Sequence, residues 1–216
     1  MSEEITLAQL RAWLLAYADR IDERAGYLTE LDAAIGDADH GANMVRGMAK
    51  VRARLQQDGE AYADVATLLR GVAMMLISHM GGASGPLYGA FFTRAGKDHQ
   101  GRTGISVAEL AQMFRCGLEG VQARGKADAE EKTMVDALLP AVEAMESAAA
   151  AGGTPAAAAE AALRAAEKGM KHTTGLEATK GRASYLGPRS VGHQDPGATS
   201  MYYLFETLAT VLHEAE

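Results

Sequence analysis

The stretch VATLLRGVAMMLISHM, residues 65–80, spaces its apolar side chains three and four residues apart. The repeat is carried by Val65, Leu68, Leu69, Val72, Leu76 and Met80. Because an α-helix has about 3.6 residues per turn, these side chains fall on one face. The stretch therefore predicts an amphipathic helix with a buried apolar face.

The same spacing recurs along the whole chain, whereas alternating strand patterns are missing. The seven other helical stretches are residues 10–21, 44–55, 87–92, 110–121, 135–145, 155–179 and 201–212. Eight helices in 216 residues leave only short connections, and short connections make neighbouring helices antiparallel. We predict an all-α fold, a single domain over residues 1–216 built as an eight-helix antiparallel up-and-down bundle or barrel.

Local signals suggest where several helices begin and end. The first helix opens at Thr6 with a capping-box pattern, and the second follows Asn43. The fourth begins at Pro86, a residue that is favoured in the first turn of a helix. The seventh runs from Thr154 to about Thr179. These boundaries determine which segments are expected to be loops.

Composition narrows the class of protein. The chain has 21 Lys and Arg against 28 Asp and Glu, a formal net charge of −7, which argues against a nucleic-acid partner. A single cysteine, Cys116, excludes a disulfide framework and fits a reducing compartment. The N-terminal MSEEITLAQL lacks the basic region of a signal peptide, and we find no membrane-spanning stretch. We therefore expect a cytoplasmic protein that does not enter a membrane.

The chemically unusual loops all follow odd-numbered helices. They are residues 31–41 (LDAAIGDADHG), 81–86 (GGASGP), 123–133 (ARGKADAEEKT) and 179–197 (TKGRASYLGPRSVGHQDPG). The loops after even-numbered helices, 56–64, 97–104 and 148–155, are plain polar or glycine turns. Because loops alternate between the two ends of an up-and-down bundle, the four unusual loops are expected to meet at one end, and that end is the predicted site.

The first of these loops carries three carboxylates within eight residues, Asp32, Asp37 and Asp39. Carboxylates this close repel one another, and a hard divalent cation with oxygen ligands removes the repulsion. An EF-hand starting at Asp37 is excluded because its twelfth position is Met48 instead of glutamate. Helix capping explains at most one of the three, with Asp32 the best candidate. A metal site is the better interpretation.

Two further loops have the chemistry to bind phosphate. The glycine turn at residues 81–86 precedes a helix, whose N-terminal N–H groups favour anions, although it is not a Walker A loop. The long loop carries Lys180, Arg182 and Arg189, and arginine can stabilise charge that develops during phosphoryl transfer. No residue stands out as a general base. Together the loops predict magnesium with a nucleoside phosphate.

Four segments resemble those of a known family. They are LDAAIGDADHGANM (31–44), GGASGPLYGAFF (81–92), RGKADAEEKTMVD (124–136) and KGRASYLGPRSVGHQDPGATS (180–200). They resemble the nucleotide-binding L subunits of bacterial dihydroxyacetone kinases, the Dak2 domain family, over essentially the whole chain. The resemblance implies a barrel of eight antiparallel helices that holds ADP or ATP and two Mg²⁺ ions at one end.

The resemblance also implies roles for particular residues. The implied magnesium ligands are Asp32, Asp37 and Asp39. The implied nucleotide and phosphate contacts are His40, Gly41, Ala42, Asn43, Gly82, Ala83 and Ser84, with Gly125 and Met134 bordering the base or ribose. The loop expected to cover the nucleotide contributes Arg182, Asp195, Pro196 and Gly197, and Arg182 is the candidate catalytic residue.

In such a system a separate K subunit binds dihydroxyacetone covalently, and the L subunit brings the phosphoryl group to it. Bound ADP is recharged to ATP by a phosphocarrier (M-type) subunit of the phosphoenolpyruvate phosphotransferase system. Fused chains instead use free ATP. This chain ends at Glu216 without a K-like region, which favours the phosphocarrier route. Two alternatives remain open: a kinase subunit for a four-carbon ketose (a tetrulose), and a sensor whose nucleotide state is read by a transcription regulator.

Overall fold

The computed structural model describes residues 4–58 and 62–215, and the predicted all-α class is confirmed there. The α-helices are α1 Leu7–Glu23, α2 Ala25–Ile35, α3 His40–Asp58, α4 Val65–His79, α5 Ser84–Ala95, α6 Val107–Gly125, α7 Val135–Ala150, α8 Pro155–His172 and α9 Pro196–His213. Two 3₁₀ segments, η1 Thr173–Gly175 and η2 Arg182–Ser190, lie between α8 and α9. Strands β1 Ile5–Thr6 and β2 Gly104–Ile105 form one short antiparallel pair.

The predicted count of eight helices is wrong, because nine α-helices occur in the described part of the chain. The additional helix is α2, which occupies the start of the segment that we expected to be the acidic loop. It follows α1 after a break at Arg24, and it buries Leu28, Asp32 and Ile35 along one side. Residues 31–35 of the expected loop, including Asp32, are therefore helical.

Three other boundaries differ from the sequence expectation. Helix α3 begins at His40, before Asn43, because the Asp32 carboxylate accepts hydrogen bonds from the first N–H groups of that helix. Helix α5 begins at Ser84, two residues before Pro86. Helix α8 ends at His172 instead of near Thr179, since the carbonyls that follow it turn toward a buried lysine described below.

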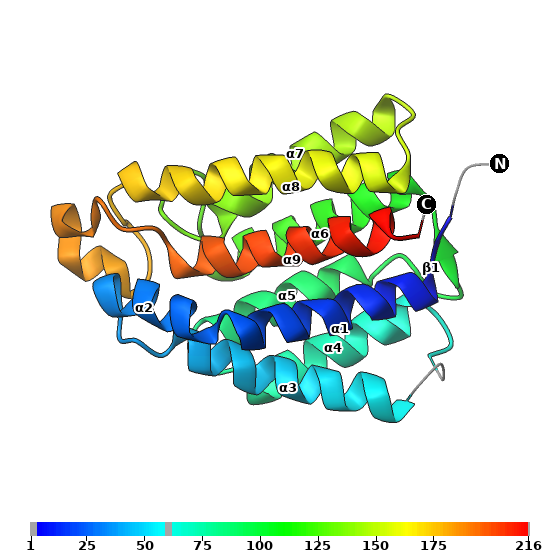
Figure 1. Ribbon diagram of the computed structural model, residues 1–216, viewed down its shortest axis with the longest axis horizontal. Helices are drawn as coiled ribbons and strands as arrows, with labels where there is room; N and C mark the ends of the chain where they lie inside the picture. Colours follow the sequence, from blue (N-terminus) through cyan, green and yellow to red (C-terminus); the bar gives the residue numbers. More distant parts are fainter. Residues whose placement is uncertain (1–3, 59–61, 216) are drawn as a thin grey trace.

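The helices pack in the order of the chain. Each helix from α3 to α9 contacts the next, and α1 contacts both α3 and α9 (Figure 1). Helix α2 packs against α3, α9 and η2 at one end of the elongated molecule, whereas the start of α1, the end of α9 and the β1–β2 pair lie at the other end. One end is thus built from α2 and the segment between α8 and α9.

An aromatic cluster from four helices fills the centre of the core. The ring of Trp13 in α1 lies 6.3 Å from that of Phe92 and 5.6 Å from that of Phe114, and Phe114 lies 5.0 Å from Phe205. Trp13 Nε1 also donates a hydrogen bond of 2.9 Å to the Leu204 carbonyl of α9. The aromatic core therefore ties α1 to α5, α6 and α9.

In the described residues no helix is long and apolar enough to cross a membrane.

Candidate metal and anion site

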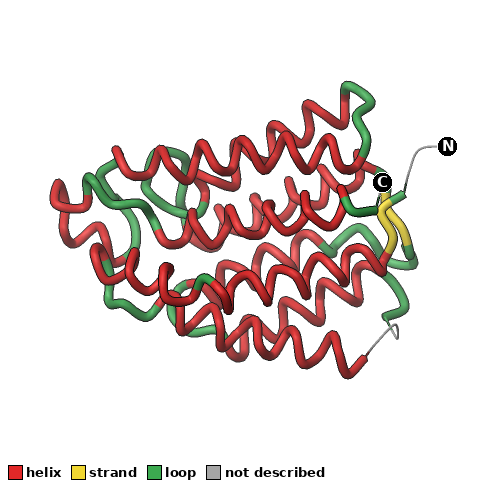
Figure 2. Tube along the Cα trace, viewed as in Figure 1, coloured by secondary structure: helices red, strands yellow, loops and turns green. Residues whose placement is uncertain are grey.

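The four unusual loops meet at the end of the molecule that carries α2, where loops drawn in green gather in Figure 2. They surround a cavity of about 540 Å³. The predicted site residues that line it are Asp32, Asp37, Asp39, His40, Asn43, Gly82, Ala83, Ser84, Gly125, Met134, Arg182, Asp195, Pro196 and Gly197. Residues from widely separated positions in the sequence therefore share one cavity.

Two predicted contacts, Gly41 and Ala42, do not line the cavity. Gly41 faces α2, where an added Cβ would lie 2.2 Å from the Ala25 carbonyl oxygen, and Ala42 is exposed. Gly41 is required for the close packing of α3 on α2. Any contact of these two residues with a ligand in the cavity is limited to their backbone.

The three carboxylates predicted as metal ligands come together at the cavity. Asp32, Asp37 and Asp39 each place a carboxylate oxygen within 4.8 Å of the other two. Oδ2 of Asp32 accepts hydrogen bonds from the Asp39 N–H at 2.8 Å and the His40 N–H at 3.1 Å. Asp32 therefore caps α3, as the capping alternative suggested, and it also belongs to the acidic cluster.

Arg182 of the long loop contacts this cluster directly. Its guanidinium lies 3.0 Å from Oδ2 of Asp37, although the Arg182 side chain is 68% exposed. The loop itself is held by a small apolar cluster in which Ala178, Ala183 and Leu186 pack against Ile35 of α2. The covering loop, residues 179–197, thus contacts α2 through apolar side chains and pairs with Asp37, two residues beyond the end of α2, through Arg182.

Four helices begin at the cavity. The first residues of α3 (His40), α5 (Ser84), α7 (Val135) and α9 (Pro196) all line it. The first N–H groups of a helix have no partner within the helix, and each helix N-terminus carries about half a unit of positive charge. Four such ends beside a carboxylate cluster favour an anion that is bound together with a cation.

A buried hydrogen-bond network fixes the imidazole of His40. Its Nε2 lies 3.0 Å from Ser200 Oγ, and its Nδ1 lies 3.3 Å from Ser84 Oγ. Ser200 Oγ also accepts a hydrogen bond of 2.9 Å from the Tyr88 hydroxyl, which in turn accepts one from Tyr17. Burial lowers the pKa of His40, so the ring is neutral at neutral pH.

Lys132 joins three segments around the cavity. Its side chain is buried, and Nζ donates to the carbonyls of Thr173, at 2.5 Å, Leu176, at 3.1 Å, and His193. Burial lowers the pKa of this lysine, while the nearby carboxyl of Asp195 opposes that shift. Lys132 thereby ties the α6–α7 loop to both ends of the segment between α8 and α9.

Asp195 is the N-cap residue of α9 and lines the cavity. Its Oδ2 accepts a hydrogen bond of 2.7 Å from the Ala198 N–H, which caps the helix. Burial raises the pKa of this carboxyl to about 7. Near neutral pH the Asp195 carboxyl is therefore only partly ionised. The charges of Asp136, Lys132 and Asp32 also act on its pKa.

An apolar part of the cavity lining, which we call the apolar wall, was not predicted from the sequence. It includes Leu87, Val121, Ala127 and Val135 beside Met134. Leu87, Val121 and Val135 belong to the amphipathic stripes of their helices, so their spacing identified them only as core residues. Their positions near the helix ends that face the predicted site could have identified them as lining residues.

The residues present fit a divalent cation with a nucleoside phosphate. Three carboxylates supply the oxygen ligands that Mg²⁺ prefers, and helix N-termini supply donors for phosphate oxygens. The apolar wall offers a surface for a flat base, and the cavity volume is in the range of small-molecule sites.

Comparisons with known proteins agree with this chemistry. The model of the DAK2 domain family matches residues 34–210. The chain is 44% identical to the PEP-dependent dihydroxyacetone kinase, ADP-binding subunit DhaL, of Escherichia coli, over 97% of this chain and 99% of that one. It is 42% identical to the PTS-dependent counterpart of Lactococcus lactis, over 96% and 99%.

A solved structure has the same fold within a longer chain. The crystal structure of the dihydroxyacetone kinase from C. freundii in complex with AMP-PNP and Mg²⁺ superposes with a TM-score of 0.73 at 25% identity. The match covers 100% of this chain and 35% of the C. freundii chain. This chain therefore spans about a third of that kinase.

Proposed function

Because the chain belongs to the DAK2 domain family, we propose that it is the ADP-binding subunit of a PEP-dependent dihydroxyacetone kinase. The observation that carries the proposal is the cavity itself, where three carboxylates and four helix N-termini face one another. We take residues 1–216 as one domain and infer a cytoplasmic location, supported by the single cysteine.

We also infer that the long helices close into a barrel, with α2 at its end. The packing of α1 against both α3 and α9 supports closure, since each remaining helix packs against its neighbour in the chain. This arrangement places the N-termini of α3, α5, α7 and α9 at the same end.

In this proposal Asp32, Asp37 and Asp39 hold two magnesium ions, which neutralise phosphate charge when bound. The N–H groups at the starts of α3 and α5 bind phosphate oxygens, with Asn43, Gly82, Ala83 and Ser84 around them. Asn43 is held in place by Arg46, whose guanidinium donates to Asn43 Oδ1 at 2.6 Å. Gly125 and Met134 border the base or ribose, beside the apolar wall.

Arg182 is the proposed catalytic residue. It lies at the acidic cluster on a loop that can cover the nucleotide, where its planar donors stabilise charge on the transferred phosphoryl group. Because phosphoryl transfer depends mainly on positioning and charge stabilisation, this chain needs no general base of its own. A separate K subunit holds dihydroxyacetone and accepts the hydroxyl proton, and a phosphocarrier subunit restores ATP from bound ADP.

The test is retention of ADP. We expect the purified chain to keep ADP through gel filtration in magnesium, to release it in EDTA, and to lose it in Asp37→Ala. Asp19→Ala is the matched control, because Asp19 is an exposed carboxylate of α1 that pairs with Arg52 away from the cavity. The proposal fails if the wild-type chain binds no nucleotide in millimolar magnesium, or if the two variants lose ADP equally.

A further inference from the structure

A second hollow, of about 480 Å³, lies between α4, α5 and α6. We call it the side groove, and it is lined by Ile77, Pro86, Ala90, Thr93, Arg94, Gly120, Ala123 and Arg124. Its lining includes the small residues Ala90, Gly120 and Ala123. At Gly120 an added Cβ would lie 2.7 Å from the Ala90 carbonyl oxygen and 2.8 Å from Cγ of Arg94. The stem of Arg94 therefore packs against Gly120, although Arg94 as a whole is exposed.

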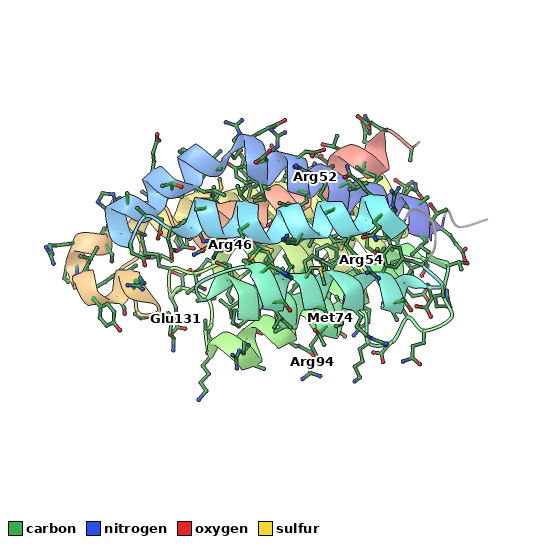
Figure 3. The ribbon with its side chains drawn as sticks, turned by 90° about the horizontal axis from the view of Figure 1, so that it is seen from below. Arg46, Arg52, Arg54, Met74, Arg94 and Glu131 are labelled. Atoms are coloured by element: carbon green, nitrogen blue, oxygen red, sulfur yellow. The ribbon has the colours of Figure 1, made fainter. Side chains whose placement is uncertain are left out.

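The rim of the side groove is apolar on one side. Met74 and Ile77 of α4 are 58% and 55% exposed, and they are two of the five large apolar residues exposed in the described parts of the chain. Ile77 lies over Gly89 of α5, where an added Cβ would come within 2.3 Å of its side chain. Figure 3 shows Met74 and Arg94 on the same face of the molecule. Exposed apolar side chains beside a hollow are typical of a protein interface.

The charge of this region differs from that of the whole chain. The chain has a net charge of −7, yet α4 and α5 contain no Asp or Glu, and the residues of α6 in the groove lining are not acidic. Arg94 and Arg124 are exposed, and across residues 4–58 and 62–215 neither guanidinium forms an ion pair or hydrogen bond. Two unpaired arginines at an apolar hollow are complementary to carboxylates that flank an apolar side chain.

The side groove adjoins the nucleotide cavity. Pro86, near the start of α5, and Arg124, near the end of α6, line both hollows. A protein seated in the side groove would therefore reach the rim of the cavity. This position suits a partner that exchanges a group with the bound nucleotide.

We propose that the side groove docks an acidic segment, with an apolar side chain at its centre, of another subunit of the same kinase. The inference rests on the proposed function, since it takes the partner to be a subunit that exchanges a phosphoryl group with bound nucleotide. A hollow fits a protruding segment better than a flat lipid surface. The net charge of −7 disfavours the extended phosphate backbone of a nucleic acid.

The test uses the full chain loaded with ADP and magnesium, and purified K and phosphocarrier subunits of the same kinase. Arg94→Glu reverses a charge at the groove, and Ala123→Trp fills the hollow from an exposed position of α6 without changing charge. Arg164→Glu on α8 is the control, because it makes the same charge change at a side chain that is 65% exposed and outside both hollows. Association is measured at low and high salt, alongside ADP affinity and the melting temperature.

We expect both groove variants to weaken association with at least one of the two subunits roughly tenfold or more. ADP affinity and melting temperature are unchanged, and Arg94→Glu reduces the salt dependence of association. Unchanged association of both subunits overturns the proposal. So does a groove variant that alters only self-association or binding to phosphatidylglycerol vesicles. A wild-type chain that binds a subunit through the groove but no ADP refutes the proposed function alone.

Discussion

Gly36 occupies a position where any larger residue would collide with a predicted cation ligand. It ends α2, and an added Cβ would lie 2.1 Å from Oδ1 of Asp32 and 2.9 Å from its carboxyl carbon. Asp32 cannot move away freely, because its other oxygen accepts hydrogen bonds from Asp39 and His40. One glycine therefore permits both the acidic cluster and the cap of α3.

Gly36→Ala is expected to displace the Asp32 carboxylate. The predicted result is a loss of about 1–3 kcal/mol in the free energy of unfolding, and a weaker affinity for Mn²⁺ used as a magnesium probe. Urea denaturation and electron paramagnetic resonance measure the two effects. Gly26→Ala in the same helix is the control, because a Cβ there meets nothing within 4 Å, so both quantities should be unchanged or slightly raised. Equal behaviour of the two variants would contradict the steric argument.

Asp195 gives stability a defined pH dependence. Burial raises the pKa of its carboxyl to about 7, against about 3.9 in an unfolded chain. The folded state therefore keeps a proton that the unfolded state releases between these two values. The contribution of this group to stability is full below about pH 4, falls as the pH rises toward 7, and is level above that.

Asp195→Asn should remove this contribution while the side-chain oxygen still accepts from the Ala198 N–H. In EDTA without nucleotide, the variant is expected to gain stability relative to wild type as the pH rises from about 4 to about 7. Urea denaturation at a series of pH values gives the difference between the two proteins, in which other titrating groups cancel. A difference that does not change with pH would show that the carboxyl ionises normally in the folded state.

At the scale of elements, the α6–α7 loop has an unusual backbone. Lys126, Glu130 and Lys132 all have positive φ angles, a conformation that residues with a Cβ adopt at some energetic cost. The buried side chain of Lys132 offsets this cost by donating to three carbonyls of the segment between α8 and α9. The α6–α7 loop therefore holds the covering loop in place through Lys132.

Lys132→Met should uncouple the covering loop from the rest of the molecule. The substitution leaves the carbonyls of Thr173, Leu176 and His193 without their donor, and we expect a loss of about 1–3 kcal/mol in stability. Hydrogen exchange should accelerate in residues 173–195, and bound ADP should dissociate faster. Lys168→Met on the exposed side of α8 is the control and should change neither rate. Normal exchange in residues 173–195 of Lys132→Met would exclude the supporting role.

The sequence predicted helix faces better than helix ends. The apolar stripes fall on buried faces because their spacing is set by helix geometry alone. The start of α3 depends on Asp32, eight residues before His40, and the end of α8 depends on Lys132, forty-one residues before Thr173. Because these contacts form only in the folded protein, local capping patterns in the sequence cannot predict the helix ends that depend on them.

For the whole molecule, the alternation of loops between the two ends predicted which end carries the site. It required only that the long helices alternate in direction, so the additional helix α2 did not invalidate it. The polar residues of the cavity lining were predicted from the loops, whereas Leu87 and Val121 were not. These two side chains contact both the hydrophobic core and the cavity, so their spacing indicated only a core position. Sequence motifs therefore identify the polar residues of a site more readily than the apolar residues that line both the site and the core.

Stability of the whole fold should depend on the contacts between α1 and α9. Trp13→Phe removes the hydrogen bond to the Leu204 carbonyl and leaves a small cavity among the aromatic rings. We expect a loss of about 1–3 kcal/mol in the free energy of unfolding, with unchanged ADP affinity in the folded protein. Urea denaturation followed by far-ultraviolet circular dichroism, with calorimetry of ADP binding, measures both. A weaker ADP affinity would mean that the core and the site are coupled.

The ion pair between Arg182 and Asp37 has a consequence for the order of events at the site. A divalent cation bound at Asp37 would compete with Arg182 for the charge of the same carboxylate, so the cation by itself would weaken the attachment of the covering loop. An anionic ligand that arrives with the cation offers the guanidinium a new counter-charge and draws the loop back. The protein would thus act as a coincidence detector, responding to metal and phosphate together and differently to either one alone.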